Sequence, residues 1–281
     1  MITNLTLEGC GVLGCGEAGA VSVLESKGIL KGITRIAGVS AGSIVATLLS
    51  TGYVSAEIKD IITNTDFSTF KDGNWTGAIQ DYERYGLHPG DVFLDWIKSK
   101  IKAKTGNELT CFGDLTSIDL VTFACSLDQR GVIRFSKETT PKTPIAYAVR
   151  ASMSIPGLFQ AYQIPGMPDT FVDGGTVMDF PVTAFDSITP EEQTLGICFK
   201  YGYAPTPIGW GHPQKAIIAL IECALNSQQV MLENSPYNLK RSIQIDTLGI
   251  SATNFGITQA EKFQLDNSGI AATIEFLSKN K

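Results

Sequence analysis

Two strand-like segments in the first 50 residues each end in a glycine-rich turn that leads into a helix-like segment. Residues 2–8 alternate apolar and polar side chains like a strand, and residues 18–26 have helical spacing. Residues 33–37 repeat the strand pattern and residues 44–49 the helical one. Strands that alternate with helices in this way usually pair in parallel within one sheet. The order therefore predicts an α/β fold with a mostly parallel sheet.

Further periodic segments extend the same unit. Residues 120–126 and 132–135 have strand character, and apolar segments near 196–199 and 243–245 are candidates for additional strands. Residues 213–226 and 258–278 are expected to be helices. No internal repeat, low-complexity tract or clear linker divides the chain. We expect one domain over residues 1–281, with core motifs at 5–182 and a helical C-terminal part at 205–281.

Charge excludes one broad class of partner. The formal net charge is −6, the isoelectric point is near 5.0, and the longest basic run is Lys240-Arg241. A nucleic-acid-binding surface would need a basic patch, so we expect no nucleic-acid partner. Contact with anionic membranes would have to be apolar or locally basic. The nearest basic patch is a run of alternate lysines, for which a solvated helix end is the favoured interpretation: Lys98, Lys100, Lys102 and Lys104.

Cysteine spacing and the N-terminal sequence bear on location. The six cysteines are scattered without a CxxC pair, which favours a reducing compartment. The chain opens without a basic and apolar signal segment, and no apolar run approaches the length of a membrane span. We expect a cytoplasmic protein, with a specialised secretion route as the alternative.

A GxSxG sequence lies between the second predicted strand and the helix that follows it. Its members are Gly38, Val39, Ser40, Ala41 and Gly42. A serine on so sharp a turn has strained backbone angles, and its neighbours two positions away must be small to avoid collision. The following helix directs its free N–H groups towards negative charge that forms at the hydroxyl. An ordinary tight turn is the alternative, but the strand-turn-helix context favours Ser40 as a nucleophile.

The other glycine-rich turn has GxGxxG spacing. Its glycines would let backbone N–H groups converge on a small anion. A nucleotide-binding loop would require an acidic residue after the next strand or a Walker lysine, and the sequence has neither. An oxyanion hole beside Ser40 explains both turns together and is favoured. Its expected members are Gly9, Cys10, Gly11, Val12, Leu13 and Gly14.

A serine hydroxyl needs a nearby base to remove its proton. Asp173 follows an apolar pair and precedes Gly174 and Gly175, which places a carboxylate at a strand end where backbones can approach closely. Asp-Gly-Gly by itself is more often a turn. The order Ser40, Asp173, His212 formally matches an α/β-hydrolase triad, but His212 and His88 each precede proline in loop-like segments. We favour a Ser40–Asp173 dyad.

Taken together, these motifs resemble the patatin-like phospholipase family along nearly the whole chain. Residues 7–14, with Gly19 and Leu24, resemble its oxyanion loop and first helix, and residues 36–43 resemble its nucleophile elbow. Residues 148–159 and 171–175 resemble the segment before the catalytic Asp and the Asp-Gly-Gly motif. Residues 245–250 and 253–276 resemble the C-terminal part of microbial members.

The resemblance implies a three-layer α/β/α fold and a Ser–Asp dyad with neither histidine, metal nor cofactor. It implies hydrolysis of acyl esters of phospholipids or related lipids, of phospholipase A or lysophospholipase type, through an acyl-serine. The partners would be the lipid substrate and, transiently, a membrane surface. The aromatic residues between 64 and 110 would then line an acyl channel or form a lid, although core packing is favoured for most of them: Phe67, Phe70, Trp75, Tyr82, Tyr85, Phe93 and Trp96.

Two positions depart from the family pattern. Leu13 stands where the family usually has Arg or Lys, so a positive charge beside the oxyanion is missing. Phe180 stands where Asn is common before Pro181. The alternatives are therefore a weak or silent member that binds lipid or protein, an acyltransferase, and an enzyme that waits for a protein activator.

Overall fold

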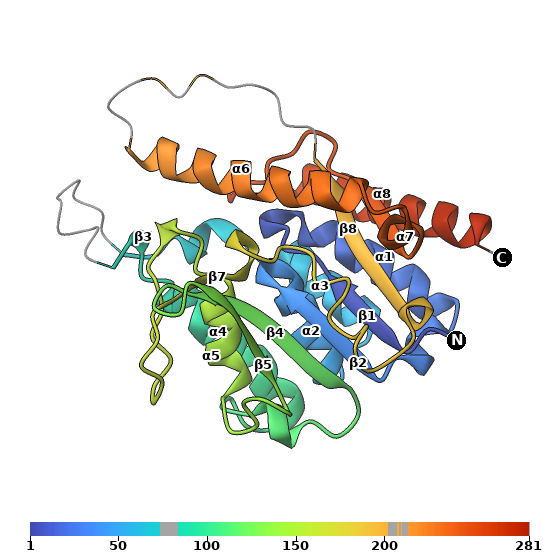
Figure 1. Cartoon of the computed structure of the whole chain (residues 1–281), viewed down its shortest axis with the longest axis horizontal. Coiled ribbons are helices and arrows are strands. Elements are labelled where there is room, and N and C mark those ends of the chain that lie inside the picture. Colours follow the sequence, from blue (N-terminus) through green and yellow to red (C-terminus); the bar gives the residue numbers. More distant parts are fainter. Residues whose placement is uncertain (74–83, 202–206, 208, 210–212, 281) are drawn as a thin grey trace.

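A computed structural model describes residues 1–73, 84–201, 207, 209 and 213–280. In these residues a seven-stranded sheet forms the centre of the molecule (Figure 1). Along the sheet the strands are β5 (Gly131–Ser136), β4 (Asp119–Ser126), β2 (Arg35–Val39), β1 (Asn4–Leu7), β8 (Thr194–Lys200) and β9 (Ser242–Asp246), and β7 (Phe171–Asp173) also pairs with β4. The five strands from β4 to β9 pair in parallel, whereas β5 and β7 are antiparallel to β4. The expected α/β fold with a mostly parallel sheet is confirmed.

Helices join and cover these strands. They are α1 (Gly14–Ser26), α2 (Ser40–Ser50), α3 (Ser55–Asn64), α4 (Asp91–Thr105), α5 (Ile145–Ser152), α6 (Pro213–Glu233), α7 (Pro236–Lys240) and α8 (Gln259–Lys279). A small parallel sheet of β3 (Gly86–His88) and β6 (Gly157–Phe159) lies apart from the central one. Figure 1 shows α6 running across one side of the molecule, over the segments that hold β7 and β8. Helix α6 thus closes over the edge of the sheet where the predicted site residues lie.

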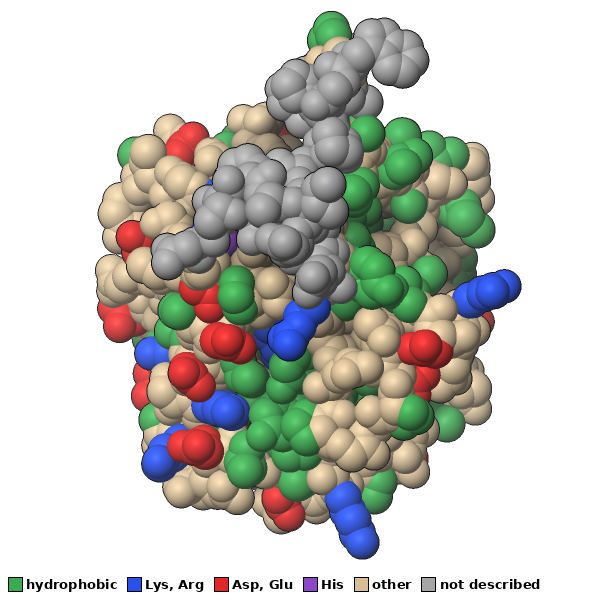
Figure 2. Space-filling model, turned by 90° about the vertical axis from the view of Figure 1, so that its left-hand side faces the viewer, with side chains coloured by type: hydrophobic (Ala, Val, Ile, Leu, Met, Phe, Trp, Pro, Cys, Tyr) green, Lys and Arg blue, Asp and Glu red, His purple; other side chains and the backbone are tan. Residues whose placement is uncertain are grey.

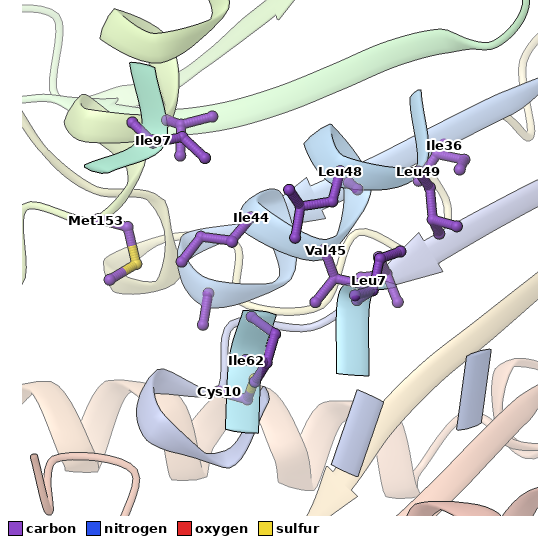
Figure 3. Close-up of a cluster of buried hydrophobic side chains, with 14 of the residues drawn as sticks. Leu7, Cys10, Ile36, Ile44, Val45, Leu48, Leu49, Ile62, Ile97 and Met153 are labelled. Atoms are coloured by element: carbon purple, nitrogen blue, oxygen red, sulfur yellow. The ribbon is translucent and has the colours of Figure 1, made fainter. Parts of the chain in front are cut away.

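The main core lies between the sheet and the helices of one face. Leu7 of β1 and Ile36 of β2 point towards Val45 and Leu48 of α2 (Figure 3). Every residue of α2 is buried, as expected for a helix enclosed by a sheet and other helices. The opposite face of the sheet carries a smaller apolar cluster, in which Phe185 packs on β2 and β4. Apolar packing on both faces holds β2 and α2, and the turn between them, in place.

The aromatic residues between 64 and 110 serve mostly as core. Phe67, Phe70 and Phe93 are buried, and Trp96 packs against Phe70 and Phe93 at ring-centroid distances of 5.4 and 5.9 Å. Tyr85 is exposed. Trp75 and Tyr82 lie outside the described residues. The core-packing interpretation is therefore confirmed for Phe67, Phe70, Phe93 and Trp96.

The alternate lysines lie on α4, and two of them are paired with acids. Lys102 lies 3.1 Å from Glu108, and Lys104 lies 2.8 Å from Glu57. These pairs are exposed, so each stabilises the fold by little. The interpretation as a solvated helix end agrees with this geometry better than a headgroup site does.

Candidate active site

The GxSxG sequence forms the junction of β2 and α2. Ser40 is the first residue of α2 and has φ of +49°, a left-handed conformation that is strained for a residue with a side chain. A Cβ atom on Gly42 would come within 2.8 Å of the Leu7 carbonyl oxygen, and one on Gly38 within 2.6 Å of the Gly42 carbonyl carbon. Real Cβ atoms do not approach so closely, so both glycines are required by the turn.

Ser40 and Asp173 meet at the carboxyl ends of their strands. The Ser40 hydroxyl donates a hydrogen bond of 2.6 Å to Asp173 Oδ2, and the other oxygen, Oδ1, accepts the Gly175 N–H at 2.8 Å. Each of the two side chains is 5% exposed. Burial raises the pKa of Asp173 to about 7, although the hydrogen bonds from Ser40 and Gly175 lower it. Asp173 is thus placed and tuned as a base for the Ser40 hydroxyl near neutral pH.

Ser152, at the end of α5, holds the backbone of the elbow. Its hydroxyl accepts the Ser40 N–H at 2.8 Å and donates to the Phe123 carbonyl at 2.6 Å. Ser43 adds a second brace by donating to the Ser40 carbonyl at 2.5 Å. Sequence reasoning gave Ser152 no role, since its partners lie far along the chain. The strained conformation of Ser40 is therefore fixed by side chains from two helices.

The turn at residues 9–14 uses half of its backbone donors internally. The N–H groups of Gly9, Val12 and Leu13 donate to the carbonyls of Asp179, Ala252 and Cys10 at 2.9, 2.9 and 3.0 Å. The expected oxyanion role of this turn narrows to the N–H groups of Cys10, Gly11 and Gly14. Of these residues, Gly11 lines the cavity beside Ser40. Leu13 is fully buried in the core.

Three more acidic side chains lie buried around this turn. Burial raises the pKa of Glu8 to about 8, against the lowering effect of a 2.6 Å hydrogen bond from the Phe199 N–H. Burial, followed by the charge of Glu8, holds the pKa of Glu17 and that of Asp179 well above the ordinary range. Sequence reasoning missed this cluster, because acids distant in sequence meet only in the fold.

A cavity of about 330 Å³ opens above Ser40 and Asp173. Its wall is largely apolar, with Ile155, Ile221, Leu225 and Ile250 among the lining residues. Helix α6 is fastened over it by Gln228, whose amide donates to the Gly175 carbonyl at 2.9 Å and accepts the Asp179 N–H at 2.7 Å. The volume is at the small end of the range for ligand pockets. The cavity suits an apolar ligand group delivered to Ser40.

Neither histidine stands beside Ser40 in the described residues. His88 Nδ1 lies 2.9 Å from the Asp72 carbonyl, in the small sheet. His212 lies outside the described residues. In the same part of the chain no group of three or more His, Cys, Asp or Glu side chains is arranged to hold a metal ion. No described helix combines the length and hydropathy that crossing a bilayer requires.

Comparison with known proteins identifies relatives across the whole chain. The family model described as patatin-like phospholipase matches residues 5–186. The uncharacterized protein YqhO of Bacillus subtilis (strain 168) is 30% identical over 301 aligned residues, which cover 99% of either chain. The uncharacterized protein R571 of Acanthamoeba polyphaga mimivirus is 29% identical and covers 99% of this chain and 94% of its own.

Solved structures share the fold at lower sequence identity. VipD from Legionella pneumophila has a TM-score of 0.69 and 18% identity, with 99% of this chain and 67% of that chain covered. ExoU of Pseudomonas aeruginosa, in complex with SpcU, has a TM-score of 0.57 and 17% identity. The chain spans about half the length of ExoU, with 52% covered. These likenesses show the fold.

Proposed function

The chain belongs to the patatin-like phospholipase family, and from that premise we propose that it hydrolyses acyl esters of lipids through Ser40 and Asp173. The observation that carries the proposal is the 2.6 Å hydrogen bond from the Ser40 hydroxyl to Asp173, on an elbow with a strained serine. A buried hydroxyl bonded to a carboxylate with a pKa of about 7 is the arrangement that nucleophilic catalysis needs. The substrate class is an acyl ester of a phospholipid or related lipid.

In the first step Asp173 accepts the Ser40 proton while Oγ attacks the ester carbonyl carbon. The carbonyl oxygen becomes an oxyanion, which N–H groups of the turn at residues 9–14 stabilise. The intermediate then collapses: the bond to the alcohol oxygen breaks, and the alcohol leaves with the proton held by Asp173. The product of this step is an acyl-serine at Ser40.

In the second step Asp173 accepts a proton from water, and the resulting hydroxyl attacks the acyl-serine carbonyl. The bond between Ser40 Oγ and the acyl carbon breaks, the serine recovers the proton from Asp173, and the fatty acid leaves. The apolar cavity wall favours an acyl chain over a charged group at this position. Transfer of the acyl group to another alcohol would use the same intermediate.

The outer face of α6 supports contact with a lipid surface. Leu220 and Met231 are 70% and 71% exposed, and Val230 lies beside Met231 on the same exposed side. These apolar side chains lie on the helix whose inner face covers the cavity. The face seen from the left of Figure 1 mixes acidic, basic and hydrophobic side chains where atoms are not grey, so it offers no single-sign charged surface (Figure 2). We expect membrane contact to be apolar and to occur through α6.

Covalent labelling with a fluorophosphonate tests the proposal directly. An activated serine attacks phosphorus and is phosphonylated, whereas an ordinary serine hydroxyl is not. We expect the wild type to be labelled at Ser40, and Ser40→Ala and Asp173→Asn to be labelled at least about 100-fold more slowly. Labelling of the wild type at the rate of Ser40→Ala would support a silent binding protein. The complex of ExoU with SpcU suggests repeating the assay with cell extract, in case a protein partner is required.

A further inference from the structure

A second carboxyl group, that of Asp179, faces the same cavity as Asp173 and has no assigned role. Asp179 is 5% exposed and lines the cavity with Ser40 and Asp173. Both oxygens of Asp173 are engaged, by Ser40 and by Gly175. Among the described residues the Asp179 carboxyl makes no hydrogen bond; it is held only through its backbone, by Gln228 and Gly9. An unpartnered polar group thus points into the site.

Its position is fixed by two glycines. A Cβ atom on Gly9 would overlap Asp179 Oδ1 and would lie 3.3 Å from Ser40 Cβ. A Cβ atom on Gly175 would lie 2.6 Å from the same oxygen and 3.1 Å from Asp173 Oδ1. The carboxyl oxygen therefore occupies the space between the glycine-rich turn and the base, next to the nucleophile. That space is where a carbonyl oxygen attacked by Ser40 must be accommodated.

The charges around Asp179 are all of one sign. Glu8 follows β1, Glu17 lies on α1, Asp173 ends β7 and Glu222 faces the cavity from α6, while Cys10 and Tyr201 are the other titratable groups nearby. No Lys or Arg side chain is among the described residues that line the cavity. Burial, then the charges of Glu8, Asp173 and Glu17, raises the pKa of Asp179 well above its ordinary value. Near neutral pH the group is a protonated acid with an O–H to donate.

The turn beside Ser40 is short of donors. The N–H groups of Gly9, Val12 and Leu13 are paired with backbone carbonyls, and Leu13 supplies no charge. A carboxylic acid kept neutral by its surroundings can serve as an oxyanion donor, as it does in ketosteroid isomerase. Asp179 has the position and the free hydrogen-bonding capacity for this task.

We propose that Asp179 donates a hydrogen bond to the carbonyl oxygen of the ester that Ser40 attacks, and so completes the oxyanion hole. The proposal rests on the proposed function of Ser40 and Asp173. The Asp179 proton stays on its carboxyl throughout, so no additional proton transfer is involved. The donor is lost when the carboxyl ionises, and its negative charge then opposes the oxyanion. Hydrolysis must therefore fall at alkaline pH as Asp179 loses its proton.

The test compares kcat for a short-chain acyl ester between about pH 6 and about pH 10 in the wild type, Asp179→Ala and Asp179→Asn. Loss of one oxyanion donor costs roughly 100- to 1000-fold in kcat, and we expect that loss in Asp179→Ala with KM little changed. Asp179→Asn keeps an N–H donor that cannot ionise. We expect it to lose less than about tenfold and to lack the alkaline decline of the wild type.

Glu8→Gln and Glu222→Gln are the matched controls, because each removes another carboxyl near the site. Glu222→Gln should keep the alkaline decline, and Glu8→Gln should move it to lower pH, since the charge of Glu8 raises the pKa of Asp179. The inference is wrong if Asp179→Ala keeps the wild-type kcat and decline, if Asp179→Asn is as slow as Asp179→Ala, or if Glu8→Gln abolishes the decline. Failure of the proposed function is distinct, since Ser40→Ala would then hydrolyse the ester as fast as the wild type.

Discussion

The hydroxyl of Ser152 accepts the backbone N–H of Ser40 at 2.8 Å and so ties α5 to the strained serine of the elbow. Because Ser152 also donates to the Phe123 carbonyl, one buried hydroxyl satisfies two backbone groups. Its removal would leave both groups buried without a partner. The bond therefore contributes both to folding and to the placement of the nucleophile.

We expect Ser152→Ala to lower the free energy of unfolding by about 1–3 kcal/mol, the usual cost of an unsatisfied buried group, and to lower kcat. Urea denaturation and ester hydrolysis measure the two effects. Ser50→Ala is the matched control, because the Ser50 hydroxyl is buried on α2 and makes no hydrogen bond among the described residues. Equal stability of Ser152→Ala and Ser50→Ala would contradict the bracing role.

The rate of hydrolysis should rise with pH through the pKa of Asp173. The base must be a carboxylate to accept the Ser40 proton, and burial raises its pKa to about 7. Activity should therefore be small at pH 5, half-maximal near pH 7 and maximal above it, until any alkaline decline begins. A profile of kcat/KM against pH measures this. Full activity at pH 5 would show that Asp173 ionises as an ordinary aspartate and would argue against its assigned environment.

Much of the site can be predicted from local sequence. The turn around Ser40 is legible because the requirement for small residues at 38 and 42 is set by the turn itself. Asp173 is legible for a similar reason, since it precedes two glycines at a strand end. The strands and helices of the first 50 residues follow from periodicity, and β1, α1, β2 and α2 lie where that periodicity predicts them.

The remainder of the site depends on tertiary contacts that no local pattern reveals. Asp179 and Ser152 act on Ser40 only because the chain folds back, and their neighbours in sequence give no sign of it. Strand β7 has three residues, too few for an alternating pattern. Helix α6 extends to Glu233, beyond the expected end at 226, because Gln228 turns inward to bind the backbone of residues 175 and 179.

The free energy of unfolding should fall as pH rises from about 4.5 to about 8. Burial raises the pKa of Glu8 from 4.5 to about 8, so the unfolded chain loses this proton first. Over that window one such group costs about 1.4 kcal/mol of stability per pH unit. Glu8→Gln keeps an acceptor for the Phe199 N–H and should reduce the slope by that amount. Denaturation at pH 5 and pH 8 measures it, and identical slopes for the two proteins would refute the assignment.

Polar substitution on the outer face of α6 should weaken binding to lipid. We expect Leu220→Ser with Met231→Ser to lower the affinity for phosphatidylcholine vesicles about tenfold or more, since each buried apolar side chain is worth about 1.5–3 kcal/mol. Hydrolysis of a soluble short-chain ester should change little. Leu127→Ser, in the turn between β4 and β5, is the control for loss of an exposed apolar side chain. Vesicle sedimentation measures binding, and equal binding by both variants and the wild type would exclude α6 as the contact.

Fatty-acid release from mixed phospholipid micelles by the wild type, Ser40→Ala and Asp173→Asn tests the proposed dyad most directly, with folding checked by circular dichroism. Release by the wild type, and a loss of at least about 1000-fold in both folded variants, is the predicted result. Release by Ser40→Ala or Asp173→Asn at the wild-type rate, or release by none of the three with Ser40 unlabelled by fluorophosphonate, would contradict it.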